Sequence, residues 1–223
     1  YRKLGDHAKA REVLERALAI KERAYGRDHL EVAKTLTNLG SAYGALGDHA
    51  KERDMQERAL AIKERAYGRD HVEVAITLFN LGIAHGSLGD NSKKCELLER
   101  VLPIWTRAYG TDHPHTEMCQ ENLDDARSDL KFPLRAAAKR GDVDAITRLL
   151  DDGAEADQAN EGGTTPLFYA CACGHVDVAR LLLDKGADVN QAQGTGETAL
   201  FIACQNGHTD IGRMLLERGA EVD

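Results

Sequence analysis

The sequence repeats itself with two different periods. In the first half, the segment Leu4–Lys9 returns as Leu46–Lys51 and, altered, as Leu88–Lys93, which gives a period of 42 residues. In the second half, glycines recur every 33 residues, at Gly141, Gly174 and Gly207. Repeats of this length form stacked supersecondary units, each of which buries its apolar face on its neighbours. Such arrays offer long surfaces and rarely a closed reaction pocket, so the periodicity predicts a binding protein.

Composition narrows the class of protein. The chain has 223 residues, which is enough for two modest domains. No apolar run approaches the roughly 20 residues of a membrane span, and we expect no signal peptide, although the chain does not begin with Met and a signal could have been removed. The five cysteines show no Cys-x-x-Cys spacing, which disfavours a disulfide framework or a zinc site. We therefore expect an intracellular, cytoplasmic chain without a membrane partner.

Charge is distributed unevenly along the chain. Residues 1–131 carry 21 Lys and Arg against 22 Asp and Glu, whereas residues 132–223 carry 8 against 15. Binding to nucleic acid rests on contacts from Lys and Arg to the phosphates. The acidic second half therefore argues against a nucleic-acid partner.

Each 42-residue unit is expected to form two helices. We call the helix that begins near Asp28 the first-type helix, and the helix that follows Asp48 the second-type helix. One begins near Asp28, which we interpret as an N-cap with Glu31 three residues later, as in a capping box, and Asp70 repeats the pattern. Apolar residues then follow at helical spacing. The segment Leu46–Asp48 is predicted to end this helix and to cap the next one, which runs to Gly68.

The residues that define the unit lie in both of its helices: Ala10, Leu14, Ala17, Leu36, Leu39, Gly40 and Tyr43. This pattern resembles the tetratricopeptide repeat, in the long 42-residue form seen in kinesin light chains. The resemblance implies an α-α superhelical solenoid over residues 1–131. The last first-type helix, about 114–130, has Asp124 where Gly40 stood and no second helix after it, so we expect a terminal, solvated helix.

The second array, residues 132–223, has a different pattern. Thr165–Ala170 opens one unit, Gly174–Asp177 and Leu181–Asn190 follow, and Thr198–Phe201 opens the next unit. This pattern resembles the ankyrin repeat, which implies a stack of helix pairs joined by short β-hairpins. Taken together, the two arrays predict an all-α fold in two domains.

Several residues that could carry chemistry have a simpler explanation. Asp-His pairs recur at 28–29, 70–71 and 112–113. Equivalent positions of adjacent repeats are separated by roughly 8–10 Å, the distance between packed helices, whereas a zinc ion needs all of its donor atoms within about 2 Å. The Asp-His pairs are therefore predicted to cap helices and not to bind a metal. His113-Pro114-His115 is predicted to be a loop, and Cys171 a core residue. No catalytic constellation stands out, so we expect no enzyme activity, cofactor, metal or small-molecule substrate.

An asparagine recurs in register in three first-type helices, at Asn38, Asn80 and Asn122. The resemblance implies that this position faces a concave groove, where an amide can pair with the N–H and C=O of an extended peptide. The same register predicts further groove residues at Lys34, Thr37, Ser41, Ile76, Phe79 and Ile83. A ligand with an apolar anchor would suit the middle of this groove, and a basic flank would suit the acidic last helix, which carries Glu121, Asp125 and Asp129. Alternatively, the asparagines bond to a neighbouring helix or reflect recent duplication.

The second array offers its own candidate surface, on its hairpins and first helices. The predicted surface residues are Glu161, Thr164, Tyr169, Thr195, Glu197 and Gln205. The chain is thus expected to be a scaffold for a protein or peptide partner. Two alternatives stay open: a regulatory or sensor arm of a larger signalling enzyme, and a structural spacer without a specific ligand.

One departure from the repeats lies in the last second-type helix. Pro103 falls inside it and predicts a kink. Trp105 stands where Lys21 and Lys63 stand, on a face that we expect to be solvated. We therefore predict that residues near the junction of the two arrays at least partly cover Trp105.

Overall fold

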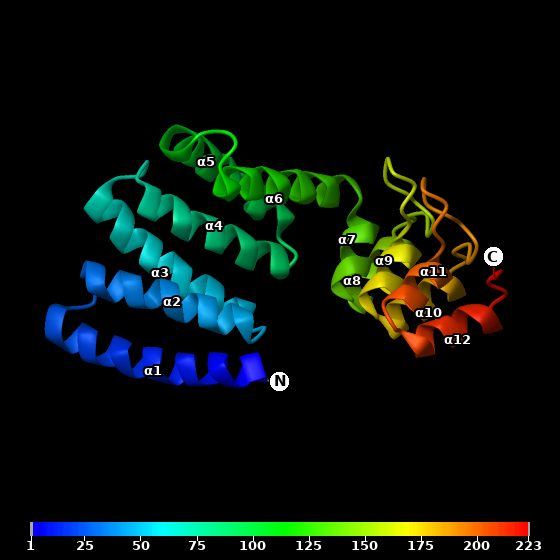
Figure 1. The fold of residues 1–223 in the computed structure, drawn as a ribbon, viewed down its shortest axis with the longest axis horizontal. Helices are drawn as coiled ribbons and strands as arrows, with labels where there is room; N and C mark the ends of the chain where they lie inside the picture. Colours follow the sequence, from blue (N-terminus) through cyan, green and yellow to red (C-terminus); the bar gives the residue numbers. More distant parts are fainter. Residues whose placement is uncertain (1, 223) are drawn as a thin grey trace. The chain divides into compact units, whose positions relative to one another are not determined.

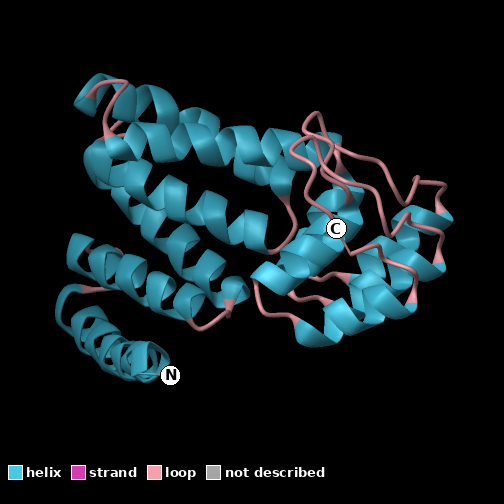
Figure 2. Cartoon of the chain, turned by 45° about the vertical axis from the view of Figure 1, so that its right-hand side comes forward, coloured by secondary structure: helices cyan, strands magenta, loops and turns pink. Residues whose placement is uncertain are grey.

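A computed structural model describes residues 2–222, and this part of the chain contains twelve helices and no β-strand (Figures 1 and 2). The chain divides into two compact units, Tyr1–Arg127 and Ser128–Asp223, which we call the first and the second unit. The all-helical fold class agrees with the prediction from the two periods.

The first unit is a row of antiparallel helices that follow one another along the chain (Figure 1). Its helices are α1 (Arg2–Tyr25), α2 (Leu30–Ala45), α3 (His49–Tyr67), α4 (Val72–Ser87), α5 (Asn91–Tyr109) and α6 (Pro114–Lys131), of which the last ends in the second unit. Each 42-residue period therefore supplies two helices, as its pattern of apolar residues predicts.

The turn between the two helices of a period is built by its Leu-Gly-Asp sequence. Gly47 adopts a φ of 82°, which a residue with a Cβ rarely adopts. Asp48 then caps α3, because its side chain accepts a hydrogen bond from the Lys51 N–H at 3.2 Å. Asp90 caps α5 in the same way, with the Lys93 N–H at 3.0 Å.

The first-type helices are capped by histidine, so the predicted caps at Asp28 and Asp70 are wrong. His71 precedes α4, and its Nδ1 accepts a hydrogen bond from the Glu73 N–H at 3.1 Å. The ring of Tyr67 stacks on it, with centroids 4.5 Å apart and an interplanar angle of 14°. The same cap and stack occur one period earlier and one period later, at Tyr25 with His29 and at Tyr109 with His113.

The His71→Ala variant is expected to lose about 0.5–2 kcal/mol of unfolding free energy, because alanine cannot accept the Glu73 N–H. Thermal denaturation followed by circular dichroism measures this loss. His7→Ala is the matched control, because His7 lies exposed within α1. If both variants melt at the same temperature, His71 is not a cap.

One repeat position joins each second-type helix to the first-type helix that follows it, and the residues at this position are Lys21, Lys63 and Trp105. Lys63 is only 2% exposed, and its Nζ donates to the Glu73 carboxylate at 3.2 Å and to the Thr77 hydroxyl at 3.0 Å. Lys21 makes the corresponding bond to Glu31 at 3.1 Å. The expectation that this face is solvated is therefore wrong, since the position faces the next helix.

Trp105 takes this position in the third step and is 2% exposed. Its ring centroid lies 5.1 Å from that of Phe79 on α4 and 5.4 Å from that of His115 on α6. The tryptophan is covered as predicted, but these covering rings belong to the helices of the first unit and not to the segment that joins the units. Pro103 lies inside α5 without ending it, and the kink stays a prediction.

The second unit stacks three short helix pairs, and its inner helices α7, α9 and α11 pack in sequence. Its helices are α7 (Pro133–Arg140), α8 (Val143–Asp151), α9 (Pro166–Cys173), α10 (Val176–Asp184), α11 (Ala199–Gln205) and α12 (Thr209–Glu217). Thr165 and Thr198 cap α9 and α11 by accepting hydrogen bonds from the backbone N–H three residues later.

The short β-hairpins predicted for this unit are not seen among residues 2–222, and this prediction is wrong. The loop before α9 makes one turn, in which the Asn160 N–H donates to the Thr164 carbonyl at 3.1 Å. The loop before α11 repeats it with Gln193 and Glu197 at 2.9 Å. Paired strands need a ladder of such bonds, and these isolated bonds do not form one.

Histidines tie each helix pair of the second unit to the preceding pair. His208 Nε2 lies 3.2 Å from the Ala172 carbonyl oxygen. Its ring lies against Gly174, which has a φ of 80° and where a Cβ would lie 2.7 Å from a ring atom. One repeat earlier, the same arrangement is made by His175, Lys139 and Gly141. These glycines are therefore required both by their conformation and by a close neighbour.

Candidate functional site

The predicted groove residues lie on adjacent first-type helices. On α2 the exposed positions are Lys34, Asn38 and Ser41. On α4, the next first-type helix along the row, the half-buried positions are Ile76, Phe79, Asn80 and Ile83. We call these residues, together with Asn122 on α6, the ladder face.

The three asparagines differ in their hydrogen bonds. Within residues 2–222, the side chains of Asn38 and Asn80 make no hydrogen bond to protein, and Asn38 is exposed. The Nδ2 of Asn122 instead donates to the Met118 carbonyl of its own helix at 2.9 Å. Two of the three amides thus have both their donor and their acceptor available to a ligand.

Thr37 lies beneath this face and not on it. It is 8% exposed, and its hydroxyl donates to the Ala33 carbonyl at 3.1 Å. Its own carbonyl accepts from Gln56 Nε2 at 3.1 Å. Phe79 packs partly on the core, where its ring meets Trp105, and it leaves the rest of its surface exposed to solvent.

The charged end of the ladder face is an ion-pair cluster between α1 and α2. Glu31 accepts from Lys34 at 2.8 Å and from Lys21 at 3.1 Å. The Lys34 bond, followed by the Lys21 bond, lowers the pKa of Glu31 to about 2. Two lysines share one carboxylate, so this end carries a net positive charge at neutral pH.

The acidic residues expected beside the groove differ in their surroundings. Asp129 forms an ion pair with Arg135 at 2.8 Å, and both side chains are less than 10% exposed. Asp125 is half-buried, and Glu121 is exposed and also lines a hollow beside α6. A basic flank on the groove ligand stays a prediction, to which Asp129 contributes least because Arg135 already pairs with it.

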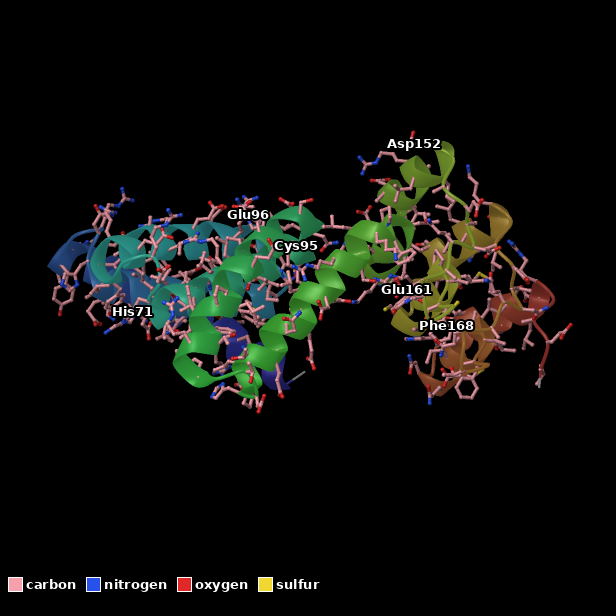
Figure 3. The ribbon with its side chains drawn as sticks, turned by 90° about the horizontal axis from the view of Figure 1, so that it is seen from above. His71, Cys95, Glu96, Asp152, Glu161 and Phe168 are labelled. Atoms are coloured by element: carbon pink, nitrogen blue, oxygen red, sulfur yellow. The ribbon has the colours of Figure 1, made fainter. Side chains whose placement is uncertain are left out.

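The candidate surface of the second unit is partly used by internal contacts. Glu161 accepts from Lys131 at 2.6 Å, which lowers the pKa of Glu161. Thr164 is buried and donates to Gln193 Oε1, while Tyr169 is half-buried. The remaining predicted residues sit on the loop before α11 and on that helix: Thr195 and Gln205 are exposed, and Glu197 accepts from Thr195 and Gln193. Figure 3 labels Glu161 and, on α9, Phe168.

Two of the free cysteines, Cys119 and Cys171, lie in the core. Burial raises the pKa of the Cys171 thiol to about 12 and that of Cys119 to about 11, so both are neutral, unreactive thiols at pH 7. Among the described residues, no three His, Cys, Asp or Glu side chains are grouped to hold a metal ion. In the same part of the chain, no helix combines the length and apolarity that crossing a bilayer requires.

Several hollows among the described residues lie outside the ladder face. One of about 540 Å³ lies between α5 and α6. Two others, of about 370 Å³ and 420 Å³, lie at α11 and α12 around Leu200 and Cys204. Sequence reasoning missed the α6 hollow, although comparing α6 with α2 and α4 position by position would have found it.

Comparison with known proteins identifies both arrays. A family model of the tetratricopeptide repeat matches residues 1–65, and another matches residues 74–115. A model of ankyrin repeats in three copies matches residues 108–193 and 134–223, which together exceed half of the chain.

Matches to individual proteins come from solved structures. None of the curated proteins compared with the chain matches it. One similar solved structure is the predatory endopeptidase Bd0816 from Bdellovibrio bacteriovorus in complex with the immunity protein Bd3460. The match has 32% identity and a TM-score of 0.39, and it covers 40% of this chain and 47% of that chain. The two periods, the helix pairs and the matching models agree, and the chain belongs to the repeat proteins in which tetratricopeptide repeats are followed by ankyrin repeats.

Proposed function

We propose that the chain is a protein-interaction scaffold whose ladder face binds an extended peptide segment of a partner protein. Tetratricopeptide and ankyrin repeats are protein-interaction modules, which supports the general role. The observation that carries the specific proposal is the pair of unbonded amides, Asn38 and Asn80, on neighbouring helices at the same repeat position. The 42-residue period also supports a kinship with the long repeats of kinesin light chains.

The physical basis is complementarity to a peptide backbone. A primary amide offers a donor and an acceptor together, which matches one peptide N–H and one C=O. Beside Asn80, the partly exposed Ile76, Phe79 and Ile83 offer apolar contact to a ligand side chain. At the α2 end, Lys34 adds positive charge. The ligand is therefore an extended peptide with an apolar anchor residue.

Changing Asn38, Asn80 and Asn122 to alanine should weaken peptide binding by more than about tenfold. Each lost amide pairing costs on the order of 0.5–1.5 kcal/mol, and the two unbonded amides should account for most of the effect. Peptides selected from a display library on the intact chain, titrated by fluorescence anisotropy, measure this change. Helix content should not fall, because alanine is the better helix former.

The control is Glu57→Ala, which removes an exposed side chain of α3 outside the ladder face. Phe79→Ala should also weaken binding, since it removes the apolar contact. Wild-type affinity in the triple alanine variant would show that the selected peptides bind elsewhere and would overturn the proposal.

The same reasoning covers the cell compartment and the class of ligand. We propose a cytoplasmic protein that acts without catalysis, cofactor or metal. We further propose that it binds neither nucleic acid nor membranes, in keeping with the formal net charge of -8.

A further inference from the structure

The first unit has a second surface, distinct from the ladder face, on the last helix of its row. A hollow of about 540 Å³ opens there between α5 and α6. Its lining on α6 is Thr116, Glu117, Gln120, Glu121 and Asp124, and its remaining walls are Leu102, Thr106 and Thr111. We call this surface the end face.

The end face occupies the position at which a helix packs in the two preceding repeats. Gln120 corresponds to Leu78 of α4, which is fully buried, and Asp124 corresponds to Gly82. A Cβ at Gly82 would lie 3.4 Å from the Leu98 side chain of α5. On α4 this face is therefore covered by a helix, and α3 covers the same face of α2. The end face is the equivalent surface of α6, and it is therefore the place at which a further helix would pack.

The residues of the end face disfavour the packing of a further repeat of the same type. Asp124 puts a carboxylate at the position of Gly40 and Gly82, both of which lie against the covering helix. Second-type helices are also joined by ion pairs, in which Glu22 accepts from Arg58 at 2.7 Å and Glu64 accepts from Arg100 at 2.6 Å. The residue 42 positions after Glu64 is Thr106, whose side chain has no carboxylate and cannot form this ion pair. The occupant must therefore differ from the helices of the array.

The charges of the end face indicate what that occupant carries. Glu117, Glu121 and Asp124 are spaced i, i+4 and i+7, so they line one face of α6. Glu117 and Glu121 are exposed and form no ion pair within residues 2–222. Asp124 is 61% exposed at its side chain and lies 3.8 Å from Arg127. Leu102 contributes an apolar wall beside these carboxylates.

We propose that the end face docks a basic amphipathic helix of a partner protein. The helix lies antiparallel to α6, as α3 and α5 lie against their own first-type helices. Its Lys or Arg residues, at i, i+4 and i+7, pair with the three carboxylates, and an apolar residue between them contacts Leu102. This docking is independent of peptide binding at the ladder face, so the two proposals can fail separately.

The probe is a synthetic helical peptide with lysines at i, i+4 and i+7 and leucines between them, titrated against the full chain by fluorescence anisotropy. Glu117→Gln, Glu121→Gln and Asp124→Asn together should weaken its binding by about tenfold and should flatten its dependence on salt. Circular dichroism checks the fold, and the ladder-face peptides should bind the Glu117→Gln, Asp124→Asn double variant, which leaves Glu121 unchanged, as they bind the wild-type chain.

Two controls separate docking from general attraction between opposite charges. Asp54→Asn, Glu57→Gln and Glu96→Gln remove three acidic groups from exposed positions of α3 and α5 outside the hollow, and binding should change less than twofold. A peptide of the same composition with a proline in its centre cannot form the helix, and it should bind at least tenfold more weakly. Equal loss in both charge variants, or equal binding of the proline peptide, would overturn the proposal.

Discussion

The Gly174→Ala variant should unfold its ankyrin repeats roughly 10–20 °C below the wild-type chain, from a loss of about 2–3 kcal/mol. Gly174 has a φ of 80°, which costs an alanine about 1–2 kcal/mol. The new Cβ would also lie 2.7 Å from the His208 ring and displace it. His208 would then lose its hydrogen bond to the Ala172 carbonyl, which is worth about 0.5–1.5 kcal/mol.

Gly207→Ala is a matched control, because Gly207 has nearly the same φ of 77° but no atom within 4 Å of the added Cβ. It should show the conformational cost alone, about 1–2 kcal/mol. Calorimetry measures both variants, and amide exchange of α9 and α10 assigns the transition. If Gly174→Ala and Gly207→Ala are equally destabilised, the contact with His208 contributes nothing.

The Arg135→Leu variant should lose about 3–5 kcal/mol of unfolding free energy in the second unit. Arg135 is 4% exposed, and it donates to Asp129 at 2.8 Å and to Ser128 at 2.9 Å. Its guanidinium also lies over the rings of Phe132 and Tyr169. The substitution removes one positively charged partner from a carboxylate that is 8% exposed, and weakening the ion pairing of so buried a carboxylate is costly.

The double variant Arg135→Leu with Asp129→Leu tests this explanation, because replacing both charges by apolar groups is often close to neutral. It should recover most of the lost stability in chemical denaturation. Lys131→Ala is the control at an exposed ion pair, with Glu161, and should change the midpoint little. A double variant no more stable than Arg135→Leu would show that the aromatic contacts, and not the buried carboxylate, set the cost.

Features that repeat with the period could be predicted from the sequence, because they depend on neighbours a few residues away. Helix pairs follow from apolar spacing, and Asp48 caps its helix because an aspartate after Leu-Gly meets an N–H three residues on. The register of Asn38 and Asn80 also follows from the period alone. The sequence by itself therefore determined the fold class, the two kinds of repeat and the positions of the ladder.

Only the tertiary structure decided which group each side chain meets. The histidine cap at His71 depends on a ring rotamer held by Tyr67, which a capping-box pattern does not contain. Trp105 is buried because Phe79, distant in sequence, lies beside it. Asn122 bonds to its own helix, whereas Asn38 and Asn80 do not, although all three share one sequence position. Contacts between helices are set by packing over long separations in sequence, and the period does not encode them.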